Sequence, residues 1–111
     1  MVIKLKINNV EIEDLDLMDA DVAEKFEKAT NNLQEKEKSQ DLTGKGLAEI
    51  IRIQCTLIFD FFNDVWGKGT DKKIFGNKTN YRICEKAFKD VVEYAMKQKN
   101  EVLKVAKVKK K

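Results

Sequence analysis

Residues 47–66, LAEIIRIQCTLIFDFFNDVW, decide the fold because they include the most apolar stretch of the chain. Most of the few polar residues in this segment recur every three or four positions: Glu49, Arg52, Thr56, Asp60 and Asn63. This spacing predicts a helix with one narrow polar stripe and apolar side chains around the rest of its circumference. We therefore expect this helix at the centre of the molecule, in contact with neighbours on most sides.

The N-terminal residues predict a β-hairpin. In residues 2–13, VIKLKINNVEIE, apolar and charged residues alternate on both sides of Asn8 and Asn9. Asparagine tolerates positive φ, so we expect a two-residue type I′ turn at this pair. Lysines on the first arm would then face glutamates on the second, which favours the pairing. Because two strands alone are marginally stable, the hairpin must pack on helices or pair its edge with another chain.

An amphipathic helix is expected before the central one in the sequence. Residues 21–38 carry one apolar stripe at helical spacing, formed by Val22, Phe26, Ala29 and Leu33. Asp19 and Asp21 precede this stripe as caps, and Glu24 follows Asp21 at the spacing of a capping box. Thr43 is the predicted cap of the central helix.

The last helix is expected from about residue 80 to residue 107, capped by Thr79 or Asn80. Its apolar stripe steps by three or four and consists of Cys84, Phe88, Val91 and Ala95, widened by Val92 and Met96. Beyond Met96 the stripe thins to Val102, Leu103, Val105 and Val108 among lysines. We expect this C-terminal part to project from the domain or to order against another surface.

Residues 66–79, WGKGTDKKIFGNKT, contain three glycines and four lysines and raise the question of a phosphate-binding loop. A Walker A loop needs a strand before it and a Gly-Lys-Ser/Thr end. Here the preceding element is a predicted helix, and Gly76 is not followed by lysine. We interpret the segment as a corner between helices, with Gly67 and Gly76 as helix stops and a one-turn helix capped by Thr70 or Asp71.

The predicted fold is α+β and mainly α: an N-terminal β-hairpin followed by three principal helices and a one-turn helical corner. The chain has 111 residues and no proline, which fits one domain rich in helices. We expect residues 1–96 to form this domain and residues 97–111 to form a lysine-rich helical extension.

Composition also bears on compartment and charge. Cys55 and Cys84 lie in apolar helical patterns, so we expect reduced core thiols in a cytoplasmic protein. No signal peptide and no membrane span is expected. Residues 1–71 contain 15 acidic and 9 basic residues, whereas residues 72–111 contain 4 acidic and 13 basic ones. An acidic first part and a basic last part could meet on two copies of the chain.

No chemical site is predicted. The chain has no histidine, which removes the commonest general base and transition-metal ligand. Four aspartates recur every two or three positions: Asp14, Asp16, Asp19 and Asp21. They lack the glycine and distal glutamate of a calcium loop, so we interpret them as caps and a solvated rim. We therefore expect no catalytic residue, no cofactor, no metal and no enzymatic activity.

Two segments resemble a known class of proteins. Residues 2–29, VIKLKINNVEIEDLDLMDADVAEKFEKA, and residues 61–80, FFNDVWGKGTDKKIFGNKTN, followed by Cys84 and Ala87-Phe88, are similar to small proteins of tail-gene modules in phages and prophages of Gram-positive bacteria. Those proteins resemble tail-assembly chaperones, which keep the long helical tape-measure protein soluble during assembly. The resemblance spans about residues 2–95 and implies no active-site residue, and the lysine-rich end departs from it.

The main hypothesis is thus a non-enzymatic tail-assembly protein of the host cytoplasm that binds a hydrophobic helical partner, such as the tape-measure protein, and self-associates. The predicted partner-binding residues lie at the apolar end of the central helix and in the corner after it: Phe59, Phe62, Val65, Trp66, Ile74 and Phe75. Two alternatives stay open. One is a small basic nucleic-acid-associated protein that uses the terminal lysines. The other is a structural homo-oligomer built by pairing of hairpin edges.

Overall fold

The first element is a two-stranded antiparallel hairpin of β1 (Lys4–Ile7) and β2 (Val10–Glu13). The structure, a computed structural model, describes residues 4–109 and the side chains of residues 5–104. Asn8 and Asn9 have φ of 52° and 61°, as a type I′ turn requires. The register places lysines of β1 opposite glutamates of β2, with Lys6 facing Glu11. The predicted hairpin is confirmed.

An antiparallel helix pair follows, formed by α1 (Ala20–Ser39) and α2 (Leu47–Trp66). Of the two predicted caps of α1, Asp19 is confirmed: its carboxylate accepts a 2.9 Å hydrogen bond from the Asp21 backbone N–H. The predicted capping box centred on Asp21 was wrong, because Asp21 lies inside the helix. The cap of α2 is Gly46, not Thr43, because the chain makes a separate turn in which the Asp41 side chain accepts from the Thr43 backbone N–H.

The corner after α2 contains the short helix α3 (Thr70–Phe75) between glycines. Gly67 and Gly76 end α2 and α3 with φ of 110° and 62°, which confirms both as helix stops. The predicted side-chain cap of α3 was wrong: its cap is Gly69, while the Thr70 hydroxyl donates back to the Gly67 carbonyl oxygen. The resulting corner buries Thr70, Ile74 and Phe75 of α3, whereas Lys72 and Lys73 stay exposed.

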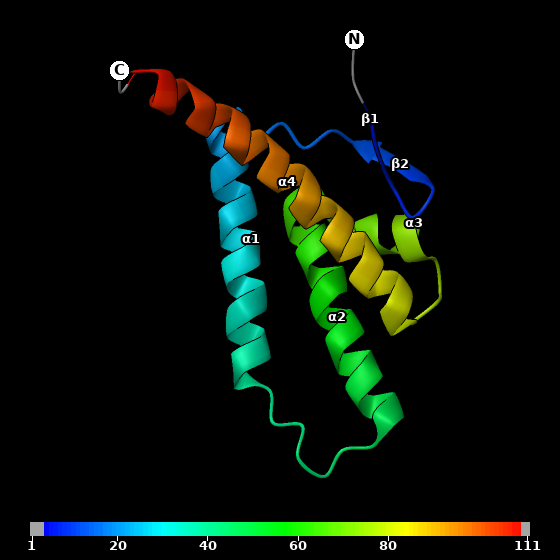
Figure 1. The fold of residues 1–111 in the computed structure, drawn as a ribbon. Helices are drawn as coiled ribbons and strands as arrows, with labels where there is room; N and C mark the ends of the chain where they lie inside the picture. The colour runs from blue at the N-terminus through cyan, green and yellow to red at the C-terminus, as the bar shows by residue number, and fades with distance from the viewer. Residues whose placement is uncertain (1–3, 110–111) are drawn as a thin grey trace.

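The last helix, α4 (Tyr81–Lys109), runs without a break through the residue at which we expected the domain to end. The Asn80 side chain accepts a hydrogen bond from the Ile83 backbone N–H, as predicted for its cap. Figure 1 shows α4 crossing the α1–α2 pair obliquely, with its C-terminal end extending past the N-terminal end of α1. The hairpin and α3 lie beside the other end of α4.

The core lies where α1, α2 and α4 meet. Phe61 of α2 is 1% exposed, and its ring makes edge contacts with Phe26 of α1 and Phe88 of α4 at centroid distances of 5.8 and 5.1 Å. The hairpin contributes Ile7 and Ile12 to the same cluster. The chain is therefore mainly helical with an N-terminal hairpin, and the predicted fold class is confirmed. Because Phe61 of α2 contacts both α1 and α4 in this cluster, residues 47–66 lie at the centre of the molecule, as predicted.

Candidate functional site

The six residues predicted to bind a partner lie at an internal joint of the fold. Four of them are buried in the core: Phe62, Val65, Ile74 and Phe75. The other two, Phe59 and Trp66, are half-buried and pack against the same core. As a set, these side chains cannot form an exposed surface in this fold, because they fill the space between α2, α3 and the hairpin. Whether any of them contacts a partner stays a prediction.

Trp66 shows what the joint does. Its ring stacks on Phe62 with a centroid distance of 5.5 Å, and its indole N–H donates a 2.8 Å hydrogen bond to the Glu13 carbonyl oxygen. Phe59 packs against Phe75 of α3 with ring centroids 5.1 Å apart. These contacts hold β2 and α3 against the end of α2. The apolar C-terminal end of α2 is thus covered by other residues of the same chain.

Exposed apolar side chains gather at a different place, along the groove between α1 and α4. Met96, Val102 and Leu103 of α4 are 50%, 53% and 46% exposed. They line one wall of a hollow of about 500 Å³, with Phe26 of α1 on the opposite wall. We call it the apolar hollow; its other lining residues are Leu17, Ala23, Glu27, Ala95, Gln98 and Lys99. Neighbouring exposed apolar side chains of this size indicate a contact surface.

A second hollow of about 370 Å³ lies further along the same two helices, and α2 contributes Leu57 and Ile58 to it. Its α1 and α4 residues include Leu33, Phe88 and Val92. We call it the acidic hollow because its charged lining residues are Glu37, Glu85, Glu93 and Lys89. The α4 residues of both hollows, from Phe88 through Val92 and Met96 to Leu103, recur at helical spacing. Together the two hollows form the α1–α4 groove.

A polar clamp sets the position of one end of this groove. The Gln98 side chain accepts a 2.7 Å hydrogen bond from the Leu17 backbone N–H and donates one of 2.7 Å to the Leu15 carbonyl oxygen. One turn earlier on α4, the Tyr94 hydroxyl donates to the Asp14 carboxylate. That hydrogen bond, followed by burial, raises the pKa of Tyr94 to about 12. The connector between β2 and α1 is thereby fixed along α4.

The sequence pattern of the groove residues predicts other positions for them. Met96 was expected to widen a core stripe, and Val102 and Leu103 were assigned to a projecting tail. A signal was present, because apolar residues continue at helical spacing on α4 beyond the length that the other elements can cover. What the sequence did not indicate is that the N-terminal turns of α1 would form the facing wall.

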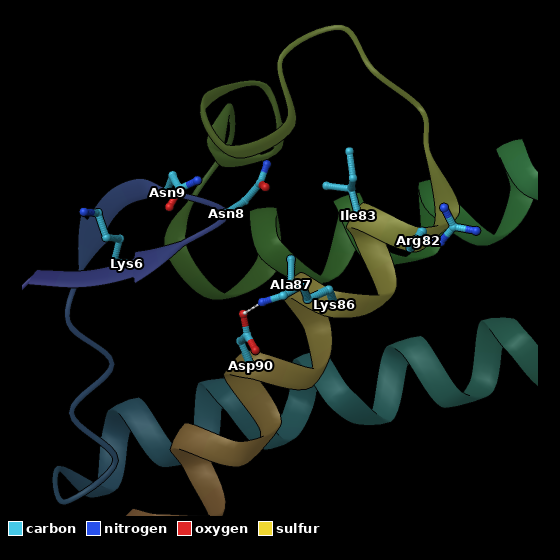
Figure 2. A pocket seen from close by; sticks show the side chains of 8 residues that line it. All are labelled: Lys6, Asn8, Asn9, Arg82, Ile83, Lys86, Ala87 and Asp90. Atoms are coloured by element: carbon cyan, nitrogen blue, oxygen red, sulfur yellow. Dashed lines mark hydrogen bonds and ion pairs between the residues drawn. The ribbon is translucent and has the colours of Figure 1, made fainter.

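A hollow of about 390 Å³ between the hairpin tip and α4 carries basic side chains that do not converge. Figure 2 shows Lys6 and Arg82 at opposite ends of this hollow, pointing away from each other. Lys86 pairs with Asp90 at 3.3 Å, and the Asn8 amide donates to the Ile74 carbonyl oxygen at 2.9 Å. Lys86 and Asn8 thus have partners within the chain, and Lys6 and Arg82 point apart, so this hollow is a weaker candidate site than the groove.

Both cysteines lie in the hydrophobic core as free thiols. Cys55 of α2 and Cys84 of α4 are both fully buried and free. Burial first, and then a hydrogen bond with the Cys55 thiol, raises the pKa of Cys84 to about 12, which keeps its thiol protonated and weakly nucleophilic. Among the described residues, no group of three or more His, Cys, Asp or Glu side chains could hold a metal ion. None of the described helices is long and apolar enough to cross a membrane.

Comparisons with known proteins give one assignment. No curated protein and no solved structure matches the chain. The model of a protein family described as "Family of unknown function (DUF6673)" matches residues 8–110, from the hairpin turn to the end of the lysine-rich helix. Because this match covers nearly the whole chain, the protein belongs to the DUF6673 family.

Proposed function

We propose that this protein is a non-enzymatic, chaperone-like tail-assembly protein of a phage or prophage. It binds an amphipathic helix of a protein partner, such as the tape-measure protein, in the α1–α4 groove. The single observation that supports this most strongly is the exposure of Met96, Val102 and Leu103 on one wall of the apolar hollow. The resemblance of residues 2–29 and 61–80 to tail-module proteins supplies the biological setting, which is the host cytoplasm.

The shape of the groove suits a helix. Apolar residues line it over several successive turns of α1 and α4, from Phe88 to Leu103 on the α4 side. An amphipathic helix laid along such a groove presents side chains at positions i, i+3, i+4 and i+7 to successive apolar sites. Binding would remove the exposed apolar side chains of both molecules from water, which stabilises the complex by about 25 cal/mol per Å² of apolar area buried.

The charges of the groove favour a partner with basic residues beside its apolar stripe. Glu27 lies in the apolar hollow, and Glu37, Glu85 and Glu93 lie in the acidic hollow, against only two lysines, Lys89 and Lys99. A carboxylate excess on the walls repels an acidic helix and attracts a basic one. This arrangement is expected to act on partner choice and association rate more than on affinity.

Co-expression tests this function. The tagged protein is produced together with a tape-measure fragment from the same genome, and the captured fragment is quantified. We expect wild type to capture it and the double variant Met96→Glu/Leu103→Glu to lose at least about tenfold, since each change places a charge on an apolar contact. The matched control is Leu47→Glu, which alters the 75% exposed first residue of α2, outside both hollows.

Two outcomes separate function from surface. A folded wild-type protein that captures no tape-measure fragment would refute the proposed function. Capture that is equal in Met96→Glu/Leu103→Glu and in wild type would refute the groove as the contact surface. In that case Phe59→Ala and Trp66→Ala, which alter the two half-buried residues of the original prediction, become the next variants to compare.

A further inference from the structure

The C-terminal part of α4 has no counterpart to cover it in the described structure. Gln98 is hydrogen-bonded to the connector before α1, and α4 then continues for 11 residues, Lys99–Lys109. We call these residues the overhang; at 1.5 Å per residue they are about 16 Å long. Figure 1 shows that this end of α4 extends past α1. Val102 and Leu103 lie half exposed at its start.

The overhang and the opposite wall of the apolar hollow carry opposite charges. From Lys99 to Lys109 the sequence of the overhang contains four lysines and one acidic residue, Glu101. Glu27 of α1 lines the hollow, and two further exposed carboxylates, Asp16 and Asp19, lie in the connector between β2 and α1. We call these three residues the acidic rim. Each molecule therefore carries both a basic overhang and an acidic rim, and the exposed apolar side chains of the hollow adjoin them.

We propose that the overhang of a second copy of this chain occupies the apolar hollow, so that two chains form a symmetric dimer. A two-fold axis near Val102 sets the two overhangs antiparallel. Each overhang then places its apolar side chains against those of its partner and its lysines beside the partner's acidic rim. A two-fold contact of this kind needs a surface that is complementary to itself, which a hollow with Glu27 on the α1 wall and Lys99 on the α4 wall provides.

This inference rests on the proposed function in one respect: both use the same groove. A basic amphipathic helix is the partner that the groove charges favour, and the overhang is such a helix within the chain itself. The dimer would thus cover the apolar hollow when no partner is bound, and a partner helix would have to displace the second copy. In the dimer, the second copy of the chain thus blocks the binding groove.

Sedimentation velocity on the full chain tests the dimer. We expect wild type to dimerise at protein concentrations up to about 1 mM, and to dissociate more as salt is raised from about 0.1 M to about 1 M, because salt screens exposed charges. Leu103→Glu should weaken the dimer at least about tenfold. The matched control Leu47→Glu, an equally drastic change at an exposed apolar residue elsewhere, should leave it unchanged.

A charge-exchange experiment identifies the contact itself. Asp16→Lys/Glu27→Lys reverses the acidic rim, and Lys99→Glu/Lys104→Glu reverses the start of the overhang. Each variant alone should be monomeric, since like charges then face each other. An equimolar mixture of the two should form a heterodimer, because each reversed rim meets a reversed overhang and each native rim meets a native overhang. All four side chains are exposed, so folding is checked simply by circular dichroism.

The outcomes are decisive in both directions. A wild-type chain that stays monomeric, a dimer that Leu103→Glu and the charge reversals leave intact, or a mixture that does not pair would each overturn the dimer. So would a captured partner helix that binds without dissociating it. A monomer that still captures the tape-measure fragment sinks only this inference and leaves the proposed function standing. A salt-sensitive dimer that captures no tape-measure fragment would refute the proposed function and leave the dimer standing.

Discussion

The side-chain amide of Asn8, at the tip of the hairpin, donates a 2.9 Å hydrogen bond to the carbonyl oxygen of Ile74, 66 residues later in α3. This single contact joins the N-terminal hairpin to the corner that follows the central helix. It also explains why the turn uses asparagine at a position where glycine would satisfy the backbone equally well.

The turn gives a paired test of this contact. Asn8→Gly keeps the positive φ but removes the amide, so we expect the free energy of unfolding to fall by about 0.5–1.5 kcal/mol. Asn9→Gly should leave stability unchanged or raise it by up to about 1 kcal/mol, because Asn-Gly is the preferred type I′ pair. Urea unfolding measures both. Equal stability of Asn8→Gly and wild type would contradict a structural role for the Asn8–Ile74 hydrogen bond.

Trp66 is predicted to matter for stability through two separable contacts. Trp66→Phe retains a ring on Phe62 but loses the hydrogen bond to Glu13, which should cost about 1 kcal/mol. Trp66→Ala also loses the ring and should cost about 3 kcal/mol or more. Thermal unfolding of the three proteins checks this order. If Trp66→Ala is as stable as wild type, the joint between α2 and the hairpin is not a stabilising one.

The Gln98 clamp is predicted to hold the groove in shape. Gln98→Ala leaves the Leu17 N–H and the Leu15 carbonyl without their side-chain partner, so we expect a loss of about 1–3 kcal/mol in unfolding free energy. Gln34→Ala, on the exposed face of α1, serves as the control and should stay within about 0.5 kcal/mol. Hydrogen exchange should show faster exchange at the Leu17 amide in Gln98→Ala. Unchanged exchange there would show that the connector is held by other contacts.

Stability is predicted to fall in alkaline solution. The pKa of Cys84 is raised from 9.0 to about 12, chiefly by burial, and that of Tyr94 from 10.0 to about 12, chiefly by its hydrogen bond to Asp14. The native state therefore keeps protons that the unfolded chain loses above about pH 9, so this contribution is complete below about pH 9 and is lost as the pH rises toward 12.

Urea midpoints measured from about pH 8 to about pH 11 should decline in wild type. The decline should be shallower in Cys84→Ala and in Tyr94→Phe, because each variant removes one of the two groups. A decline of the same slope in Tyr94→Phe and wild type would show that the Tyr94 hydroxyl titrates alike in the native and unfolded states.

Sequence reasoning succeeded where the determinants are local. The C-terminal end of α2 at Trp66, the type I′ turn at Asn8-Asn9 and the helix stops at Gly67 and Gly76 follow from periodicity and from backbone conformations that few residues adopt. The helix caps were less accurate. Asp19 caps α1 as one of the two predicted residues, but Gly46 and Gly69 cap α2 and α3 in place of Thr43 and of Thr70 or Asp71. Several adjacent residues could each serve as a cap, and the tertiary path of the chain decides among them.

The sequence by itself determined the elements, their order and the presence of more apolar surface on α2 and α4 than a helix in water tolerates. Only the tertiary structure decided which of that surface is covered. The end of α2 is buried because a short glycine-bounded corner folds α3 back onto it, whereas Val102 and Leu103 stay exposed because α4 extends beyond the domain. Helical periodicity indicates that a face is apolar, but burial depends on contacts between residues far apart in the chain, and those contacts have no local signature.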